Sequence, residues 1–201
     1  MKLIGITGGA GTGKSEILRF IEKEYSAKIL FADELAHELM RQGTECYKEI
    51  EARFGQEDIF QAQGGIDNAK LAAVIFSDSK KREALNAIVH PAVKRRILTL
   101  VEEEREKGRF SYFILEAALL IEEGYDKICD ELWYIASSKE VRRRRLKETR
   151  GYSDEKIDAV FNSQLGEREY ESRCTKIIDN NGGLEETFCR VRAAFGEKAG
   201  K

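Results

Sequence analysis

The sequence has one proline and two histidines among its 201 residues, and it has no long run of apolar residues. No segment approaches the roughly 20 consecutive apolar residues that a membrane-spanning helix requires. The N-terminus runs directly into a short apolar strand without a basic leader, which is unlike a secretory signal. We therefore expect a cytoplasmic protein with no membrane partner.

The four cysteines form no recognisable metal or redox motif. They are far apart, show no CxxC spacing and have no histidine cluster nearby, which disfavours a zinc or disulfide-exchange site. We expect reduced, mainly buried thiols at Cys46, Cys129, Cys174 and Cys189.

Positive and negative charges nearly balance in this sequence. Charged residues make up 35% of the chain, yet the formal net charge is only −2. The overall charge therefore does not favour binding to nucleic acid or to an anionic membrane. With 42% hydrophobic residues, a chain of this length supports one substantial core with room for an insertion. We expect a monomer or a weak homo-oligomer with small-molecule partners.

Five apolar segments with charged helical stretches between them predict a parallel sheet covered by helices on both faces. The expected strands are 2–7, 27–32, 112–115, 131–135 and 176–178. A long, mostly helical stretch separates the second strand from the third, with helices expected at 44–54, 67–76 and 91–107. The sequence thus predicts a three-layer α/β core (1–33, 90–137 and 169–201), a helical substrate-binding subdomain (34–89) and a helical lid (138–168).

A glycine-rich loop follows the first strand and matches the phosphate-binding pattern G-x-x-x-x-G-K-[ST], with a helix predicted directly after it. In this motif backbone N–H groups surround phosphates, the lysine reaches the β and γ oxygens, and the hydroxyl residue ligates Mg²⁺. The strand before it and the helix after it favour this function over a chance glycine-rich turn. The predicted ATP-binding residues are Gly8, Gly9, Ala10, Gly11, Thr12, Gly13, Lys14, Ser15 and Glu16.

Two other nucleotide motifs do not fit. The dinucleotide pattern G-x-G-x-x-G fails because aligning Gly9 and Gly11 puts Lys14 at the third glycine, which argues against hydride chemistry. The guanine-reading pattern N/T-K-x-D fails because Thr175 and Lys176 are followed by Asp179, one residue too far.

Two acidic residues follow predicted strands. Asp33 comes after the second strand, where a carboxylate could serve as general base or orienter for an acceptor hydroxyl, or simply as the N-cap of a helix from Glu34 to Met40. Position alone does not separate these two roles. Glu116 follows the third strand and is a candidate for holding Mg²⁺ through water, although an acid after a strand is common.

Arg142 to Arg145 form an arginine run that fits a solvated helix face, a nucleic-acid patch or a lid over triphosphate. Consecutive residues point around a helix, so at most two can face one ligand. Nucleic acid is disfavoured because the run is short and has no aromatic residues among it. His90 and Pro91, the site of the single proline, predict the start of a helix over 92–107.

Taken together, these segments resemble the dephospho-CoA kinase family over nearly the whole chain. The resemblance is carried by Gly5 to Ser15, Phe31-Ala32-Asp33, Phe54-Gly55, Gly65-Ile66-Asp67, Val74-Ile75-Phe76, Leu85 to Pro91, Leu119 to Glu122, Gln164 and Ile178-Asp179-Asn180. Members of this family transfer the ATP γ-phosphate to the ribose 3′-hydroxyl of dephospho-coenzyme A, the last step of coenzyme A synthesis.

The resemblance implies roles for several residues. Asp33 becomes the expected catalytic base, and His90, Pro91 and Leu119 are expected to border the coenzyme site. Asn180 is expected near the adenine of ATP, and the segment from Ser138 to Gln164 would be the lid.

The sequence also departs from the family pattern. Family members usually carry proline at Ala118, arginine at Asn68, and lid arginines at Thr149 and Val160. Arg145 and Arg150 are our candidates to supply the missing lid charge, since an arginine at developing negative charge is worth several kcal/mol of barrier.

The predicted reaction is direct in-line transfer from ATP-Mg²⁺ to dephospho-coenzyme A. Lys14 and the loop hold the triphosphate, and Asp33 receives the hydroxyl proton. Two alternatives stay open at this point: a kinase of another nucleoside or nucleotide on the same core, and a nucleotide-binding regulator with little transferase activity.

Overall fold

A computed structural model describes residues 1–117 and 119–196, which form two compact units. The first unit comprises Met1–Leu30 and Lys107–Lys201, and the second comprises Phe31–Glu106. Residue Ala118, where the sequence departs from the family pattern, and the end of the predicted core at 197–201 lie outside the described residues.

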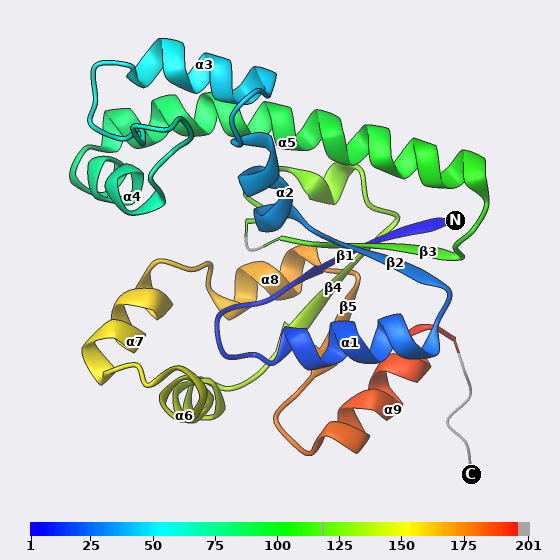
Figure 1. Ribbon diagram of the computed structural model, residues 1–201. Coiled ribbons are helices and arrows are strands. Elements are labelled where there is room, and N and C mark those ends of the chain that lie inside the picture. Colours follow the sequence, from blue (N-terminus) through cyan, green and yellow to red (C-terminus); the bar gives the residue numbers. More distant parts are fainter. Residues whose placement is uncertain (118, 197–201) are drawn as a thin grey trace. The chain divides into compact units, whose positions relative to one another are not determined.

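The first unit is built on a five-stranded parallel sheet of order β2-β3-β1-β4-β5 (Figure 1). The strands are β1 (Lys2–Thr7), β2 (Ala27–Phe31), β3 (Tyr112–Glu116), β4 (Glu131–Ala136) and β5 (Lys176–Asp179). The sequence prediction of these strands is confirmed to within one residue at each end.

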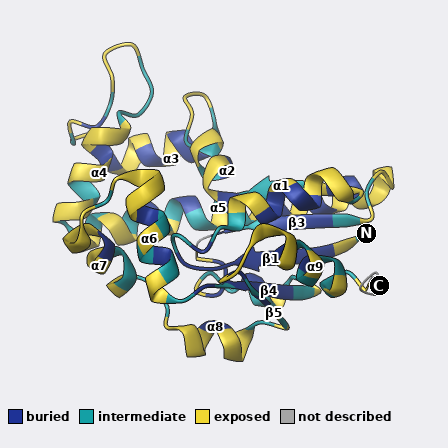
Figure 2. Cartoon of the chain, turned by 90° about the horizontal axis from the view of Figure 1, so that it is seen from below, coloured by how far each residue is buried: buried dark blue, intermediate teal, exposed yellow. Residues whose placement is uncertain are grey.

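Strand β1 is central and is almost completely buried after its first residue (Figure 2). It pairs in parallel with β3, where Ile6 lies opposite Glu116, and with β4, where Thr7 lies opposite Tyr134. Strands buried on both faces read as continuous apolar runs, which explains why the sequence alone located them. The carboxyl ends of β1, β3 and β4 therefore meet at one edge of the sheet.

Helices cover both faces of this sheet. The first-unit helices are α1 (Lys14–Glu24), α6 (Lys139–Arg150), α7 (Asp154–Asn162), α8 (Glu167–Arg173) and α9 (Leu184–Ala194), with a short 3₁₀ turn at Tyr125–Lys127. In β4, Trp133 packs against Phe195 at the end of α9, whereas Tyr134 stacks on Tyr170 of α8, each with ring centroids 4.7 Å apart. Because successive strand residues point to opposite faces, α8 and α9 lie on opposite sides.

The second unit is helical, with α2 (Ala32–Leu39), α3 (Glu45–Phe54), α4 (Asn68–Ser77) and most of α5 (Ser79–Lys107). Polar side chains cap two of these helices. The Thr44 hydroxyl accepts the Tyr47 N–H at 3.0 Å, and the Asp67 carboxylate accepts the N–H groups of Ala69 and Lys70. Such caps satisfy N–H groups that the helix leaves open, and they explain why the predicted starts of α3 and α4 lie within one residue of the observed ones.

The prediction that a helix starts at His90-Pro91 is wrong, because Pro91 lies inside the 29-residue helix α5. The helix begins at residue 79, where the Asp78 carboxylate accepts the N–H groups of Lys80 and Lys81. Buried residues recur every four positions through the proline, at Leu85, Val89, Val93 and Ile97. This packing outweighs the lost N–H of Pro91.

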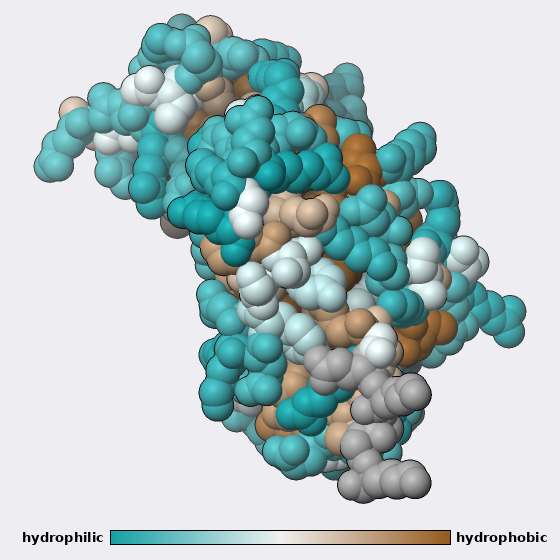
Figure 3. Space-filling view, turned by 90° about the vertical axis from the view of Figure 1, so that its right-hand side faces the viewer, coloured by the Kyte–Doolittle hydropathy of each residue, from teal (hydrophilic) through white to brown (hydrophobic). Residues whose placement is uncertain are grey.

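On the face shown in Figure 3, hydrophilic side chains predominate and apolar residues appear as separate patches. Within 1–117 and 119–196, none of the helices has the length and apolar character needed to cross a bilayer. The four cysteines are free thiols, as expected, but only Cys46 is buried and Cys189 is exposed. The expectation of mainly buried thiols is therefore wrong, because these cysteines lie largely on partly exposed helix and turn positions.

Candidate active site

The phosphate loop is held between the end of β1 and the first turn of α1 (Figure 1). Gly11 and Gly13 have φ values of 80° and 85°, in the left-handed region that favours glycine. The Gly13 conformation ends the loop as the N-cap of α1, so the positive end of the helix dipole faces the loop. The loop borders a cavity of about 480 Å³, whose lining residues are Gly9, Ala10, Gly11, Thr12, Gly13, Lys14, Ser15, Glu16, Arg145, Leu146, Thr149, Arg150, Asn180 and Leu184.

Lys14 is the central cation of this loop. Its Nζ donates a 2.6 Å hydrogen bond to the Gly8 carbonyl and lies 3.7 Å from a carboxylate oxygen of Glu116. Burial lowers the pKa of Lys14, and the positive charges of Arg142 and Arg150 lower it further, while Glu116 opposes the shift. Three cationic groups, Lys14, Arg142 and Arg150, thus interact around one carboxylate, which favours a polyanionic ligand.

Helix α6 brings two arginines to the cavity. Arg145 donates through Nη1 to the carbonyl of Thr12 at 3.3 Å and to the Ser137 hydroxyl at 3.2 Å. Arg150 lines the same cavity one turn further along the helix, and Thr149 lies beside it. The Thr149 hydroxyl donates back to the Arg145 carbonyl at 2.7 Å. The helix thus places Arg145 against the loop and Arg150 in the lining of the same cavity.

The carbonyl of Thr12 joins the loop to the ends of β4 and β5. It accepts hydrogen bonds from the side-chain amide of Asn180 at 2.7 Å, from Ser137 Oγ at 3.3 Å and from Arg145. Asn180 is 1% exposed, and its amide oxygen accepts the Thr187 hydroxyl at 2.8 Å. This buried network fixes the C-terminal part of the loop. Ser137 was not predicted, although its position directly after β4 was a usable signal.

The N-terminal part of the loop is held by Arg142 and Gln164. Arg142 Nε donates to the Ala10 carbonyl at 2.8 Å, and Arg142 Nη2 donates to Gln164 Oε1 at 2.6 Å. The same amide oxygen accepts the Ala10 N–H at 3.2 Å. A Cβ at Gly9 would lie 2.6 Å from Gln164 Oε1 and would also collide with Arg142. Glycine is thus needed at position 9 for close approach rather than for an unusual backbone angle.

The arginine run points around α6, as predicted for consecutive helical residues. Arg142 is buried against the loop, Arg145 faces the cavity, and Arg144 is exposed. Arg143 forms ion pairs with Asp154, at 2.6 Å, and with Asp158 of α7. The four arginines therefore lie on different faces of α6 and do not form one continuous basic patch for nucleic acid.

The side chains expected at the metal fit the chemistry of Mg²⁺. The Ser15 hydroxyl is exposed in the first turn of α1, and the Glu116 carboxylate is anchored at the sheet edge beside Lys14. Hydroxyl and carboxylate oxygens are the hard ligands that Mg²⁺ prefers, with water completing the shell. Within the part of the chain that the structure describes, no cluster of three or more His, Cys, Asp or Glu residues could hold a metal ion.

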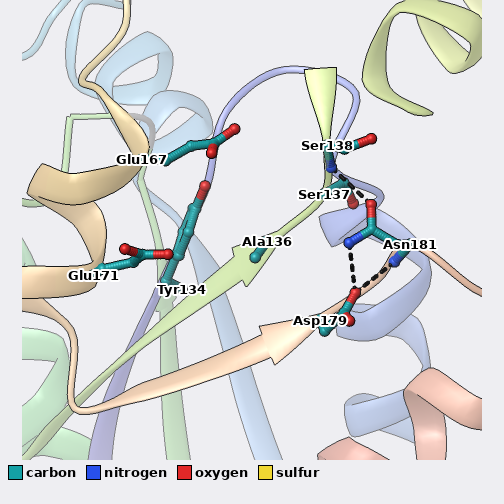
Figure 4. Close-up of a pocket in the computed structure, with 8 residues that line it drawn as sticks. All are labelled: Tyr134, Ala136, Ser137, Ser138, Glu167, Glu171, Asp179 and Asn181. Carbon is teal, nitrogen blue, oxygen red and sulfur yellow. Dashed lines mark hydrogen bonds between the residues drawn. The ribbon is translucent and has the colours of Figure 1, made fainter. Parts of the chain in front are cut away.

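A second cavity, of about 300 Å³, lies between α8 and the ends of β4 and β5 (Figure 4). Asn181 links its walls by donating to Asp179 and accepting the Ser138 N–H, both at 2.7 Å. No lysine or arginine is among the described residues that line it, so it does not suit a triphosphate. The lining residues are Tyr134, Ala136, Ser137, Ser138, Glu167, Glu171, Asp179 and Asn181.

Comparison with known proteins identifies the family. The family model described as dephospho-CoA kinase matches residues 2–186. The chain belongs to the dephospho-CoA kinase family. Two curated members illustrate the match. The dephospho-CoA kinase of Symbiobacterium thermophilum is 35% identical over 195 residues, covering 97% of this chain and 80% of that protein. That of Geobacter sulfurreducens is 35% identical over 198 residues, covering 98% and 99%.

Solved structures share the fold of this chain. The crystal structure of TT1252 from Thermus thermophilus has a TM-score of 0.79 at 30% identity and covers 99% of this chain and 98% of its own. Shikimate kinase from Acinetobacter baumannii, at 12% identity and a TM-score of 0.56, covers 100% and 96% and shares the fold alone. The predicted α/β fold with a phosphate-binding loop is thereby confirmed.

The predicted site residues are not all in one unit. Lys14, Ser15, Glu16, Glu116, Leu119, Arg145, Arg150 and Asn180 belong to the first unit, whereas Asp33, His90 and Pro91 belong to the second. Leu119 is 46% exposed in the turn after β3, and Glu16 pairs with Arg19 of α1 and lines the loop cavity. The described structure therefore brings together the residues predicted around phosphate.

Asp33 does not cap a helix. Helix α2 begins at Ala32 with Phe31 as its N-cap, so Asp33 is inside the first turn. Its side chain is exposed, and its carbonyl is 2.7 Å from Nδ1 of His37. The N-cap interpretation of Asp33 is therefore wrong, because the helix starts two residues earlier than predicted.

Proposed function

We propose that this chain is an ATP-dependent kinase that phosphorylates the ribose 3′-hydroxyl of dephospho-coenzyme A. The observation that carries the proposal is the cavity at the phosphate loop, where loop amides, Lys14, Arg145 and Arg150 converge, in a chain that the dephospho-CoA kinase model matches over residues 2–186. A cavity of about 480 Å³ has the size of ordinary ligand sites.

The chain's own groups supply phosphate binding. The loop amides and the dipole of α1 are oriented before a nucleotide arrives, and Lys14 adds a mobile ammonium that can leave the Gly8 carbonyl for a phosphate oxygen. Preorganised donors of this kind stabilise charge on the transferring phosphoryl without reorganisation during the reaction. We assign Asn180 and the adjoining loop to the nucleotide side of the cavity.

Two arginines are our candidates for the lid charge that Thr149 and Val160 do not provide. Arg145 and Arg150 both line the cavity, and Thr149 lies between them there. Burial lowers the pKa of Arg145, and so does the charge of Arg144. An anionic ligand would relieve this cost, because a partly buried cation gains most from a nearby negative charge.

Asp33 is proposed as the base that receives the proton of the acceptor hydroxyl. This assignment rests on the family resemblance around Phe31-Ala32-Asp33 and on the exposed position of its carboxylate at the start of α2. The coenzyme-side roles of His90, Pro91 and Leu119 rest on the same resemblance. General-base catalysis at such a position typically contributes a factor of about 10² to 10⁴ in rate.

Mg²⁺ would be held by Ser15 directly and by Glu116 through water, and when bound it neutralises charge on the β- and γ-phosphates. Glu116 also interacts with Lys14, so the carboxylate helps to position both cations. We further propose a cytoplasmic setting and a monomer or weak homo-oligomer, without a nucleic-acid partner; the free thiols fit a reducing compartment.

The test is ADP release from ATP-Mg²⁺ with a panel of acceptors: dephospho-coenzyme A, adenosine, a nucleoside monophosphate and shikimate. The proposal predicts strong stimulation by dephospho-coenzyme A alone. Equal slow hydrolysis with every acceptor, or stimulation by another member of the panel, would reject it.

A further inference from the structure

Arg142 is a buried cation for which the proposed reaction has no role. It is 6% exposed, and its polar partners are the Ala10 carbonyl and the Gln164 amide oxygen, both uncharged. The Phe161 ring lies under its guanidinium, 4.3 Å from Cζ to the ring centroid. No carboxylate of the described residues forms an ion pair with it. A buried charge without a counter-ion is costly, so its retention calls for a specific role.

The contacts of Arg142 and Gln164 converge on one residue of the phosphate loop, Ala10. The carbonyl of Ala10 accepts from Arg142 Nε at 2.8 Å, and the N–H of Ala10 donates to Gln164 Oε1 at 3.2 Å. Arg142 and Gln164 are themselves joined by the 2.6 Å bond. Three hydrogen bonds therefore close a ring around residue 10, fixing both polar groups of that residue. Only an arginine fork can donate to two acceptors in this fixed geometry.

This ring also joins the loop to the helices that follow β4. Arg142 lies in the first turn of α6, and Gln164 follows the end of α7. Arg142 is not among the residues that line the loop cavity, so it acts on the loop from outside the site. The other end of the loop is held independently, through Asn180 and the Thr12 carbonyl.

We propose that Arg142 and Gln164 are positioning residues that hold Ala10 of the phosphate loop in the conformation that binds triphosphate. The inference rests on the proposed phosphate-binding role of this loop and deepens it. Fixing the loop before binding removes an ordering cost that ATP would otherwise have to offset. The positive charge of Arg142 adds a second contribution, because it raises the electrostatic potential at the loop.

The experiment compares ATP affinity and thermal stability for Arg142→Lys and Gln164→Met in the full chain. Arg142→Lys keeps the charge but not the fork, and Gln164→Met keeps the volume but removes the acceptor for Ala10 and Arg142. Each variant disrupts two of the three hydrogen bonds around Ala10, and at least one of the two involves the charged guanidinium. We therefore expect ATP binding to be weaker by about tenfold or more in each variant. The matched control is Arg144→Gln, which removes one charge from the exposed side of α6 and should bind ATP within about twofold of wild type.

A second measurement separates positioning from simple stabilisation. A ligand that binds the folded state raises the melting temperature according to its affinity. We expect the ATP-induced rise to shrink strongly in both variants. The double variant should bind ATP no more weakly than about the worse single one, because both side chains act through the same residue, Ala10. A lowered melting temperature with an unchanged ATP-induced rise, or ATP affinity within twofold of wild type, would overturn the proposal. Gln164 is only half-buried, so its variant keeps the test available if Arg142→Lys does not fold.

These outcomes are distinct from failure of the proposed reaction. Wild-type protein that binds ATP but does not phosphorylate dephospho-coenzyme A would defeat the proposed function, and the affinities of the variants would still decide the role of Arg142.

Discussion

The side-chain amide of Asn180 donates a 2.7 Å hydrogen bond to the carbonyl oxygen of Thr12, across 168 positions of sequence. Asn180 is 1% exposed and follows β5, whereas Thr12 lies in the phosphate loop after β1. The amide oxygen of Asn180 in turn accepts the Thr187 hydroxyl of α9. The end of β5 and the following helix thus hold the loop in place, which ties ATP binding to the stability of the sheet.

Replacing Asn180 by aspartate should therefore destabilise the protein. The volume is kept, but a buried carboxylate would face the Thr12 carbonyl in place of the amide donor. One hydrogen bond is then lost and two acceptors meet, at a cost of about 1–3 kcal/mol. Urea unfolding at neutral pH measures the change. The exposed residue Asn162 offers the control, since Asn162→Asp should leave the free energy of unfolding within about 0.5 kcal/mol of wild type. Equal stability of the two variants would contradict the buried network.

Gly13→Ala should abolish measurable ATP binding. Position 13 has φ of 85°, and an added Cβ would collide with the Asn180 amide. Gly151→Ala is the matched control, because φ is 60° there and no atom lies within 4 Å of an added Cβ. Both changes strain the backbone by about 1 kcal/mol or more, but only the first disturbs the loop. Calorimetric titration with ATP compares them, and equal affinities would show that the close approach to Asn180 does not matter.

Arg150→Ala should lower turnover by about tenfold or more if this residue supplies lid charge. The side chain lines the loop cavity, where Thr149 offers no positive charge. Steady-state ADP release with saturating ATP and acceptor reports the effect. Arg168→Ala, on the exposed side of α8, removes the same charge away from the cavity and should leave turnover unchanged. Turnover of Arg150→Ala at the wild-type level would refute the role of Arg150.

Asp33→Asn should reduce turnover by about 10² or more while leaving ATP affinity nearly unchanged. The amide keeps the size of the side chain but cannot accept the acceptor proton. Glu34→Gln removes the neighbouring exposed carboxylate and should have little effect. Turnover is followed by ADP release and ATP affinity by calorimetry. Wild-type turnover in Asp33→Asn would exclude this residue as the base.

A charge cluster away from the loop predicts acid sensitivity. Glu131 accepts hydrogen bonds from Lys2 at 2.5 Å and from Trp133 Nε1 at 2.7 Å, and it pairs with Lys176 at 3.0 Å. Burial alone would raise the pKa of Glu131, but these partners lower it from 4.5 to about 2. Between these two values the folded protein binds fewer protons than the unfolded chain, so stability rises with pH from about 2 to 4.5 and is fully present above it.

Glu131→Gln should consequently lower the free energy of unfolding at pH 7 by about 2 kcal/mol. It should also make that free energy fall less steeply as the pH drops below 4.5. Solvent screens part of this interaction, because the Lys2 side chain is 44% exposed. Urea unfolding at several pH values from 3 to 7 gives both quantities. If the free energy of unfolding fell as steeply with acid in the variant as in wild type, a group other than Glu131 would control the acid sensitivity.

Much of the fold followed from local sequence signals, and the failures have physical causes. Buried strands such as β1 and β4 carry unbroken apolar runs, and Gly8 to Ser15 specify a loop by glycine spacing and a lysine-serine pair. The prediction of a helix start at Pro91 failed because packing along α5 outweighs the local preference of proline for helix starts.

The supports of the site were harder to foresee. Ser137 and Arg142 contact the loop across more than 120 positions of sequence. Which member of the arginine run turns toward the loop depends on the rotation of α6 about its axis, and that rotation is set by packing of Leu146 and Arg142. A run of four identical residues carries no local sign of which one is buried.

The most direct test of the account is to follow the γ-phosphate itself. Purified protein is incubated with dephospho-coenzyme A, Mg²⁺ and ATP labelled in the γ-phosphate, and the products are separated and identified by mass. Lys14→Ala is the variant expected to be inactive. Lys23→Ala, at an exposed position of α1, is the matched control that should stay active. The account predicts that the label enters coenzyme A in the wild type and in Lys23→Ala, and that Lys14→Ala nearly abolishes it. Label released only as inorganic phosphate, or coenzyme A formed equally well by Lys14→Ala, would contradict it.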